Sequence, residues 1–589
     1  REFFPGDASV GDVFEVRFEH ERGETERVAE ENRRLLDGLA GGWAVSFEGR
    51  LVEDVRDAVR RAYDVELETV HVERPNDPEH GDFATNVALA NARVFRRNPR
   101  EVAESLVGAL DAPYVREAGV AGPGFVNFRL TDGALCAEVG ALLEAGERYG
   151  RREPDGRPFM LEYVSVNPTG PMHVGHGRQA AYGDSLARIL EAAGRPVYRE
   201  YYFNDGGNQI RIFGESVAIQ YADIYGKEWP VSGPGAQYPG EYVREIAQDL
   251  ADERGEVYLQ MSQDEALLEI AAFATSWCMN DIQRTLARVR VRFDNYFNEK
   301  DLYGSGEIEA VISELEESGH VYEADGALWL DSSKLGDDKD RVLRKQDGSY
   351  TYMAPDVAYH RNKHGRGFAT AMDVLGADHA GYPPRIRAGL LALGLPEDFY
   401  EVELVRLVKL VREGEQVKFS KRAGNVVTLD ELLDEVGEDV ARYFYVRSSH
   451  KSEINFDLEL AVTQSDENPV FYVQYAHARI ASIFERAGAS PEDVGEVPAG
   501  ELAAEERQLV LELLDFPRVV ENAAARREVH QIPTYLETLA HRFHQFYTVH
   551  RVLVDDADLR ARRLALCAAT KTVLRTGLDL VGVAAPEKM

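Results

Sequence analysis

The sequence predicts an α/β protein in which a core built on a parallel sheet lies between a small α+β domain and an all-helical domain. Three observations support this fold class. From residue 159 to residue 194, a short apolar strand, a Gly/Pro turn and an amphipathic helix follow one another, as at the start of a βαβ unit. Before this unit, a stretch with helical periodicity precedes one that alternates like a strand. After about residue 444 the pattern is almost wholly helical.

The N-terminal part divides into an extension and a small domain. Residues 1–46 are polar and rich in glutamate, with a GLAGGW break, so we expect a weakly ordered extension. Residues 50–65, RLVEDVRDAVRRAYDV, carry apolar residues at helical spacing, and residues 124–130, GFVNFRL, alternate like a strand. The polar stretch GRREPDGRP then ends an α+β domain that we predict at residues 47–150.

The predicted core, residues 151–444, contains strands whose ends carry polar side chains. The strand FMLEYVSV leads through NPTGPM into a helix that begins near His173, and further strands are expected at residues 196–205 and 371–378. Ligands bind outside the carboxyl ends of strands in open α/β sheets, so these ends are the first place to look for a site. A helix at residues 471–488 opens the helical domain predicted at residues 445–589.

Length and composition restrict the class of protein. A chain of 589 residues is long enough for several domains. It has no run of about 20 apolar residues, so no helix is expected to span a membrane. The first residues lack the basic start and apolar centre of a secretory signal, which favours a cytoplasmic protein. Cys136, Cys278 and Cys567 lie far apart, so neither a disulfide framework nor a cysteine zinc site is expected.

The chain is strongly acidic and contains few lysines. The net charge is −35, and only 12 of the 67 basic residues are lysines. Because the carboxylates are spread along the whole chain, we interpret them as an adaptation to concentrated salt, which screens such self-repulsion. A negative net charge disfavours binding to nucleic acid, but a protein with a negative net charge can still carry local basic faces. Short clusters on predicted helices offer two candidate faces, Arg526 with Arg527 and Arg560 with Arg562 and Arg563, although an ordinary solvated helix face is the favoured alternative for either cluster.

Two histidines, His173 and His176 in the sequence HVGH, stand at the start of the predicted core helix. A zinc site of the HExxH type is disfavoured, because the spacing differs and the glutamate is missing. Packing in the core is the other alternative. Pro171, Gly175 and Gly177 around the pair favour close approach of a ligand to a helix start, where unpaired N–H groups attract anions. We therefore favour a phosphate site, and the chain has no GxxxxGK[ST] loop that would serve instead.

Two motifs together carry a resemblance to a known family. HVGH resembles the HIGH signature of class I aminoacyl-tRNA synthetases, and KFSKR, about 245 residues later, resembles their KMSKS signature, with Phe419 in place of the usual methionine. Over residues 50–589 the chain is similar to arginyl-tRNA synthetases in particular. The segments that show this are EYVSVNPTGPMHVGHGR, YFNDGGNQ, SYTYMAPDVAYH, LGADHAGYPPRIRA, QVKFSKRAGNVVTLDELL, DVARYFYVR, NPVFYVQYAHARI and the end GLDLVGVAAPEKM.

The resemblance implies a class I Rossmann-type catalytic core that activates arginine with ATP and transfers it to the 3′-terminal ribose of tRNA(Arg). His173, Gly175 and His176 are expected to bind ATP, as are Lys418, Ser420 and Lys421 on a mobile loop, and the two histidines and two lysines are the expected catalytic residues. ATP is expected to enter as its Mg²⁺ complex, with neither zinc nor a prosthetic group. The family also implies that tRNA is generally needed for the first step.

An arginine site needs carboxylates, because a planar guanidinium is best recognised by carboxylates in a forked arrangement. In so acidic a chain a single carboxylate would otherwise pass for a surface charge. The resemblance nominates Glu299, Tyr352 and Asp356 for the guanidinium and places Asp378 or His379 nearby. Glu162, Ser165 and Asn167 are expected to hold the α-amino and carboxylate ends of arginine.

The resemblance also implies two tRNA contacts. The N-terminal domain would approach the elbow of tRNA through Phe125 and Asn127, and the helical domain would bind the anticodon loop through Tyr475, Tyr547 and Met589. Plain burial is the alternative for each of these aromatic residues. We expect a monomer whose partners are tRNA(Arg), L-arginine and ATP. Two other classes stay open: a nucleotidyltransferase that shares only the HxGH site, and a non-catalytic RNA-binding relative.

Overall fold

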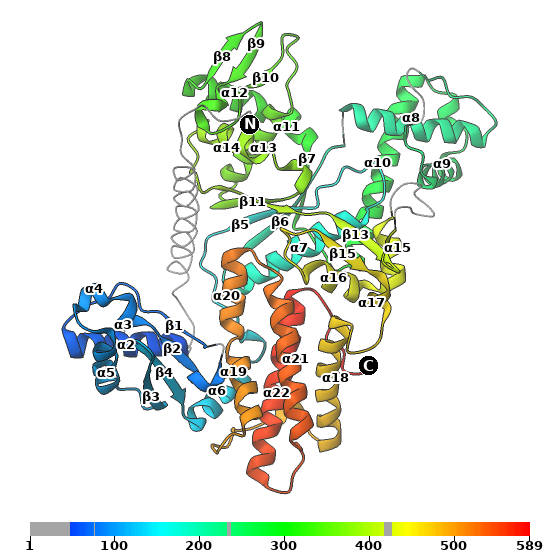
Figure 1. Ribbon diagram of the computed structural model, residues 1–589. Helices are drawn as coiled ribbons and strands as arrows, with labels where there is room; N and C mark the ends of the chain where they lie inside the picture. Colours follow the sequence, from blue (N-terminus) through cyan, green and yellow to red (C-terminus); the bar gives the residue numbers. More distant parts are fainter. Residues whose placement is uncertain (1–46, 76, 206, 232–236, 418–426) are drawn as a thin grey trace, which may run out of the picture.

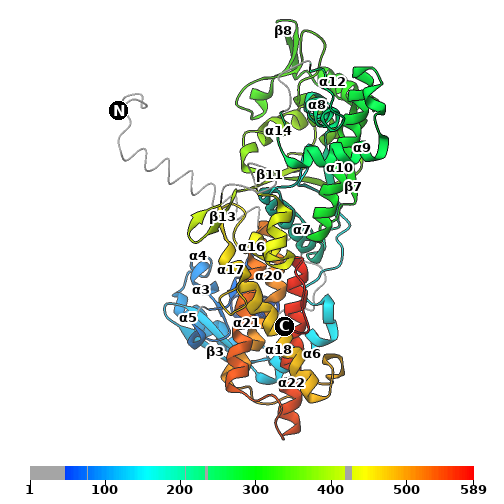
Figure 2. The ribbon, with the colours of Figure 1, turned by 90° about the vertical axis from the view of Figure 1, so that its right-hand side faces the viewer.

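A computed structural model describes residues 47–75, 77–205, 207–231, 237–417 and 427–589. The predicted extension at residues 1–46 lies outside these ranges. Lys418, Ser420 and Lys421 of the second signature lie outside them as well. Figures 1 and 2 show an elongated molecule, with a parallel sheet between a helical arm and a β-containing lobe on one side and a helical bundle on the other.

The N-terminal region is a four-stranded antiparallel sheet covered by helices. The sheet has the order β1-β2-β4-β3, formed by Val72–Glu73, Phe83–Thr85, Phe125–Leu130 and Val115–Ala121. Helices α2 (Phe47–Tyr63) and α5 (Pro99–Ala109) pack on it. Along β4, Val126, Phe128 and Leu130 are buried while Phe125 points to solvent, as the alternating sequence predicts.

The core is a five-stranded parallel sheet with the order β12-β11-β5-β6-β7. Its strands are Tyr400–Val405, Thr370–Gly376, Phe159–Tyr163, Val197–Phe203 and Asn295–Asn298. Helix α7 (Val174–Ala192) connects β5 to β6 and packs on the sheet. The three strands expected from the sequence are therefore β5, β6 and β11, and the helix expected near His173 is α7.

Two insertions interrupt the sheet. Between β6 and β7 the chain forms a helical arm with its own hydrophobic core, made of α8 (Gly207–Ile224), α9 (Glu241–Arg254) and α10 (Gln263–Arg288) (Figure 1). Between β7 and β11 it forms the β-containing lobe, which holds α11 (Glu299–Ser305), α12 (Glu307–Ser318) and α13 (Met353–Gly365). A small antiparallel sheet in this lobe, of order β10-β9-β8, consists of Arg341–Arg344, Ala327–Leu330 and Val321–Ala324.

A second small sheet joins the core to the C-terminal helices. It contains β14 (Glu415–Gln416), β13 (Val408–Arg412) and β15 (Ile454–Asp457), and β13 pairs in parallel with β15. Strand β15 follows residue 444, so part of this sheet lies beyond the predicted end of the core. Helices α15 (Leu429–Val436), α16 (Glu438–Val446) and α17 (Leu458–Val462) complete this part of the molecule, whereas α14 (Pro383–Ala392) connects β11 to β12 and packs against α13.

The C-terminal helices pack side by side along the long direction of the molecule (Figure 2). They are α18 (Pro469–Ala487), α19 (Ala504–Leu514), α20 (Phe516–Arg526), α21 (Gln531–Val549) and α22 (Ala557–Leu580). Helix α6 (Asp132–Ala145), which follows the N-terminal sheet, packs against α19 and α22. Within the described ranges, no helix has both the length and the apolar character needed to cross a membrane.

Candidate active site at the start of helix α7

The two histidines form the first turn of α7. His173 is the N-cap residue, and its Nδ1 accepts a hydrogen bond from the backbone N–H of Gly175 (3.1 Å). Nδ1 of His176 accepts from the backbone N–H of His173 (3.2 Å), and the two rings stack with centroids 3.4 Å apart. Because both Nδ1 atoms accept, the neutral tautomer assigned by these bonds carries its proton on Nε2. Each ring therefore offers one N–H donor beyond its backbone contact.

The histidines are held neutral by their surroundings. Burial lowers the pKa of His173, and burial together with the charge of His173 lowers the pKa of His176 to about 3. A Cβ at Gly175 would lie 2.9 Å from Cε1 of His173, so only glycine allows this stacked arrangement. These features suit donation of hydrogen bonds to an anion at a helix start rather than proton transfer.

The start of α7 also anchors the segment that follows the second signature. His173 forms a β-bridge with Thr428, and the backbone N–H of Leu429 donates to the carbonyl of Met172 (2.8 Å). Before the signature, the carbonyl of Arg406 accepts a hydrogen bond from the buried Arg178 of α7 (2.7 Å), which also donates to the carbonyl of Ser452 (2.8 Å), after the signature. Both flanks of the KFSKR segment are thus fixed to the helix that carries HVGH.

A strained turn after β5 arranges the next group of candidates. Val164 and Ser165 adopt positive φ angles of 70° and 43°, which are costly for non-glycine residues and are typical of functional sites. The turn brings the Ser165 hydroxyl to Oε1 of Glu162 (2.9 Å), and the same hydroxyl accepts from the backbone N–H of Tyr202 (3.1 Å). Asn167 is exposed, and its side chain donates to Gln209 (3.2 Å).

Three of the predicted carboxylates gather at the carboxyl edge of the sheet. Glu162 lies on β5, Glu299 follows β7 and Asp356 lies in the first turn of α13. Burial raises the pKa of Asp356 well above its usual range, and the charges of Glu299 and Glu162 raise it further. Burial also raises the pKa of Glu299. Such a concentration of negative charge in a buried place fits a cationic ligand.

The remaining arginine-site candidates lie at the surface. The Tyr352 side chain is 84% exposed, and Asp378 and His379 form an exposed pair 3.5 Å apart in the turn after β11. These three residues are therefore more exposed than Glu162, Glu299 and Asp356. The hydroxyl that contacts Asp356 belongs instead to Tyr382, which the sequence analysis did not nominate.

The sequence analysis also missed a buried polar layer beneath the carboxylates. Lys363 of α13 contacts Glu162 and Asp373, and Asp373 also accepts from His360 (2.9 Å) and the Tyr400 hydroxyl (3.0 Å). The available signal was helical spacing, because residues 356, 360 and 363 share one face of a helix. No motif marked Asp373 within its apolar strand.

Two further residues lie on the outer face of the N-terminal sheet. Phe125 and Asn127 alternate with the buried residues of β4, and Phe125 is 36% exposed. The alternative of plain burial is therefore wrong for Phe125. Both residues are available to a partner on that face.

Aromatic and basic side chains surround a hollow between α18 and α21. Tyr475, Arg479, His541 and His544 line a cavity of about 710 Å³. The Arg479 guanidinium lies 4.5 Å from the ring centre of Tyr475 and 5.3 Å from that of Tyr547. Met589 at the chain end is exposed. Stacking surfaces and a cation so placed are typical of sites for unpaired bases.

The two basic clusters proposed from the sequence do not form free basic faces. Arg527 is buried and pairs with Glu401 (2.9 Å). Arg562 is buried as well, and Arg563 pairs with Glu506 (2.6 Å). Spacing along a helix could not reveal these partners, because they come from distant parts of the chain. The predicted basic faces at these positions were wrong.

Comparison with known proteins assigns the family. The model described as "tRNA synthetases class I (R), catalytic domain" matches residues 138–481, "Arginyl tRNA synthetase N terminal domain" matches residues 49–130, and "DALR anticodon binding domain" matches residues 473–589. The core is thus that of a class I aminoacyl-tRNA synthetase.

Individual relatives agree with these models. The arginine–tRNA ligase of Geobacillus thermodenitrificans is 44% identical over 550 residues, which is 92% of this chain and 98% of the relative. That of Bordetella petrii is 44% identical over 538 residues, covering 88% of this chain and 95% of the relative. The Thermus thermophilus arginyl-tRNA synthetase structure has a TM-score of 0.73 and 27% identity, covering 92% of this chain and all of that one. The chain belongs to the arginyl-tRNA synthetase family.

Proposed function

We propose that this arginine–tRNA ligase joins arginine to ATP at the carboxyl edge of the five-stranded sheet and then transfers arginine to the 3′-terminal ribose of tRNA(Arg). One observation carries the assignment of the site. The carboxylates of Glu162, Glu299 and Asp356 and the imidazole donors of His173 and His176 lie at the same edge of one sheet. An arginine side chain bound by the carboxylates and a triphosphate bound at the helix start would bring the two reacting groups together.

Positioning and charge neutralisation supply most of the catalysis in this proposal. In the first step the arginine carboxylate attacks the α-phosphorus of ATP, and pyrophosphate leaves. Neutral His173 and His176 donate hydrogen bonds from Nε2 to phosphate oxygens, and Gly175 leaves a flat floor for the adenosine. Lys418 and Lys421 balance the charge that grows on pyrophosphate, and Ser420 contributes to ATP binding. ATP enters as its Mg²⁺ complex, which is a substrate.

Recognition of arginine follows from the shape and charge of its guanidinium. Asp356 and Glu299 take the guanidinium, which presents five N–H donors, whereas the lysine ammonium is a compact charge that cannot bridge two carboxylates in the same way. Glu162, Ser165 and Asn167 hold the α-amino and carboxylate ends. Tyr352 and Asp378, which are exposed, cover the substrate from the solvent side.

The other regions bind tRNA in this proposal. The domain at residues 47–150 contacts the elbow through Phe125 and Asn127, and the domain at residues 445–589 contacts the anticodon loop through Tyr475, Tyr547 and Met589. The catalytic domain spans residues 151–444, together with the β15 strand that pairs with β13. The enzyme acts as a cytoplasmic monomer, and its first step needs tRNA.

The acidic, lysine-poor composition supports a further part of the proposal, adaptation to concentrated salt. A net charge of −35 destabilises a compact chain through self-repulsion, and salt at molar concentration confines such repulsion to about 3 Å. Arginine, which supplies most of the cations, forms forked ion pairs such as that of Arg199 with Glu191, where both distances are 2.7 Å.

Attachment of labelled amino acids to total tRNA tests the function and the site together. The full chain in high-salt buffer should attach arginine but neither lysine nor glutamate. His176→Ala removes one donor and should lower kcat about 100-fold, whereas His176→Asn, which keeps an amide donor, should lose less. Attachment of no amino acid by a folded, tRNA-binding protein would favour the non-catalytic relative. Equal rates for His176→Ala and the wild type would contradict the phosphate role of the helix start.

A further inference from the structure

Lys363 is a fully buried cation beneath the carboxylates of the candidate arginine site. Its side chain has no exposed surface, and Nζ lies 2.6 Å from Oε2 of Glu162 and 2.9 Å from Oδ1 of Asp373. Nζ also lies 4.2 Å from the ring centre of Tyr359. A buried ammonium is expensive unless it is fully paired, so this one is held in place by its two carboxylates.

The position of Lys363 on α13 links the pocket to the sheet. Asp356, His360 and Lys363 lie on the same face of this helix, and that face packs against β11. His360 connects the two levels, because its Nδ1 lies 2.8 Å from the carbonyl oxygen of Asp356 and its Nε2 lies 2.9 Å from Oδ2 of Asp373. The same helix therefore carries the predicted guanidinium ligand and the cation behind it.

We propose that Lys363 is a positioning residue of the arginine site: its buried ammonium fixes Glu162 and Asp373 and sets how much negative charge the pocket presents to arginine. This inference rests on the proposed function, because it concerns the same carboxylates. It assigns a role to a residue that does not itself touch the substrate.

The charges around the pocket explain why one cation matters. Burial lowers the pKa of Lys363, but Asp373, Glu162 and Glu200 outweigh burial and raise it, so the ammonium stays charged. Burial raises the pKa of Asp356, the neighbouring carboxylates add to that rise, and Lys363 opposes it. The charged or titratable groups that face Asp356 and Lys363 are Glu162 on β5, Glu200 and Tyr202 on β6, Glu299 and Tyr303 on α11, Asp373 on β11, Tyr400 on β12, Tyr382 before α14, Tyr359 and His360 on α13, and Arg366 directly after α13.

The sign of the pH dependence follows from this arrangement. In the empty pocket, burial and the charges of Glu299 and Glu162 favour the protonated form of Asp356, whereas a bound guanidinium favours its carboxylate form. Arginine binding should therefore strengthen as the pH rises through the pKa of Asp356 and then level off. Removal of the Lys363 charge raises the pKa of Asp356, so the increase in arginine affinity should occur at higher pH. Removal of the Asp373 charge lowers this pKa and moves the rise in affinity to lower pH.

Calorimetric titration of the full chain with L-arginine, from about pH 5.5 to about pH 9, tests this prediction. Lys363→Met should weaken binding about tenfold at neutral pH and shift the rise upward by about one pH unit. Asp373→Asn should shift the rise downward, and Lys363→Arg, which keeps the charge, should leave its midpoint unchanged. Lys571→Met, which removes an ammonium on α22 that pairs with Glu587 (2.7 Å), is the matched control and should bind like the wild type.

The opposite shifts separate a charge role from a structural one. If Lys363→Met and Asp373→Asn both weaken binding by a constant factor at every pH, the inference is overturned. If Lys363→Met does not fold, Asp373→Asn alone tests the inference. Arginine binding by this variant should strengthen at lower pH than in the wild type, and the absence of that shift overturns the inference. Wild-type protein that binds no arginine would instead refute the proposed site, so the two failures are distinguishable.

Discussion

Asp356 shows, at the scale of one residue, how this site opposes stability. Burial and the charges of Glu299 and Glu162 raise its pKa well above the usual range. In the unfolded chain the same carboxyl has a pKa of about 3.9. Above that value the unfolded state gains free energy from ionisation that the folded state forgoes, so the residue destabilises the empty enzyme at neutral pH.

Asp356→Asn should therefore stabilise the empty enzyme while it removes arginine binding. The amide resembles the protonated carboxyl and does not ionise, so the melting temperature at neutral pH should rise by about 2 °C or more. The difference should shrink as the pH falls to about 4, where about half of the unfolded carboxyls are protonated as well. Scanning calorimetry at the two pH values measures both points. A lower melting temperature for the variant at neutral pH would show that the carboxylate stabilises the fold.

Residues of this kind mark the limit of sequence analysis. HVGH and YMAPD identified His173, His176 and Asp356 because a motif carries them. Lys363 and Asp373 belong to no quoted motif, and their importance comes from a contact between α13 and β11 that no local pattern encodes. The strained φ angle of Val164 could not be foreseen either, since a valine after a strand normally continues as extended chain.

At the scale of elements, α7 depends on close packing as much as on its first turn. A Cβ at Gly183 would lie 2.4 Å from the ring of Tyr163 on β5, and one at Gly177 would lie 2.6 Å from Leu429. The helix can approach both the sheet and α15 only because these residues lack side chains. The two glycines of α7 thus determine how far the histidines at its start lie from the strand ends.

Gly183→Ala should push α7 away from the sheet and impair catalysis. Overpacking of this kind costs about 1–3 kcal/mol, and the displaced first turn should lower the rate of arginine activation. Gly140→Ala on α6 is the control, because its Cβ would meet only Val497 at 3.8 Å; it should stabilise by about 0.5–1 kcal/mol through helix propensity. Urea unfolding and ATP–pyrophosphate exchange measure the two effects. Unchanged exchange in Gly183→Ala would show that the site tolerates movement of α7.

Helices and strands were predicted well where the hydrophobic periodicity and the turn-forming residues indicate the same element. The strand β5 and the helix start at His173 followed from a Gly/Pro turn after an apolar segment, and β6 and β11 followed from strand-like segments at residues 196–205 and 371–378. The β15 strand was missed because it is short, lies among helices and is defined by pairing with β13. The basic clusters at Arg527 and Arg562 were misread for the same reason: their partners are distant in sequence.

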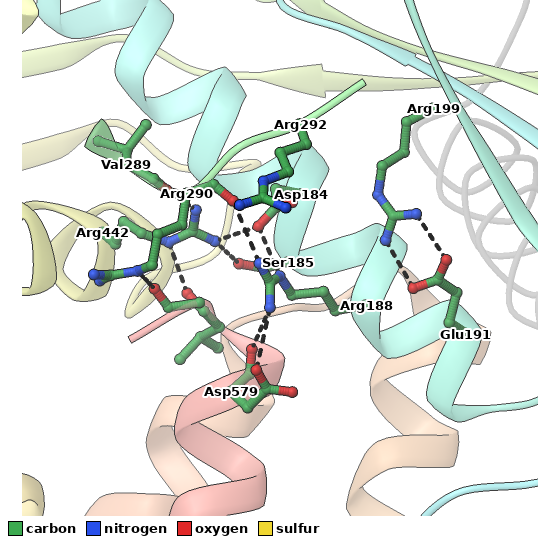
Figure 3. A network of polar contacts seen from close by, with 12 residues as sticks. Asp184, Ser185, Arg188, Glu191, Arg199, Val289, Arg290, Arg292, Arg442 and Asp579 are labelled. Carbon is green, nitrogen blue, oxygen red and sulfur yellow. Dashed lines mark hydrogen bonds and ion pairs between the residues drawn. The ribbon is translucent and has the colours of Figure 1, made fainter. Parts of the chain in front are cut away.

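At the scale of the molecule, a buried arginine joins the catalytic helix to the C-terminal bundle. Arg442 of α16 donates to Asp184 of α7 (2.7 Å) and to the carbonyl of Val581 just after α22 (3.0 Å) (Figure 3). Arg188 of α7 adds a contact to Asp579 at the end of α22 (3.2 Å). The guanidiniums thus satisfy carbonyls at the C-terminal end of α22, where cations are favoured.

Arg442→Met should weaken the whole molecule rather than one region. It leaves Asp184 with Arg188 (2.8 Å) as its remaining cation and the carbonyl of Val581 without this donor, and such a loss of buried hydrogen-bond partners costs about 1–3 kcal/mol. Arg244→Met, which disrupts the exposed pair with Asp223, should leave stability nearly unchanged. Denaturant unfolding followed by both tryptophan fluorescence and circular dichroism provides the measurement. A loss as small as that of the exposed pair would contradict a joining role for Arg442.

Net charge acts on the whole molecule, and salt changes two opposing terms. Salt weakens the exposed ion pairs, which contribute about 0–1 kcal/mol each, and it also weakens the repulsion among the excess carboxylates that give the charge of −35. Because the excess is so large, we expect relief of repulsion to win. The melting temperature should rise by about 5 °C or more between about 0.1 M and about 2 M KCl. Potassium chloride is preferred to sulfate, which stabilises proteins by exclusion from their surface. A sucrose series is the control for that exclusion. A melting temperature that fell steadily from the lowest salt upward would mean that the ion pairs outweigh the repulsion, and it would contradict salt adaptation.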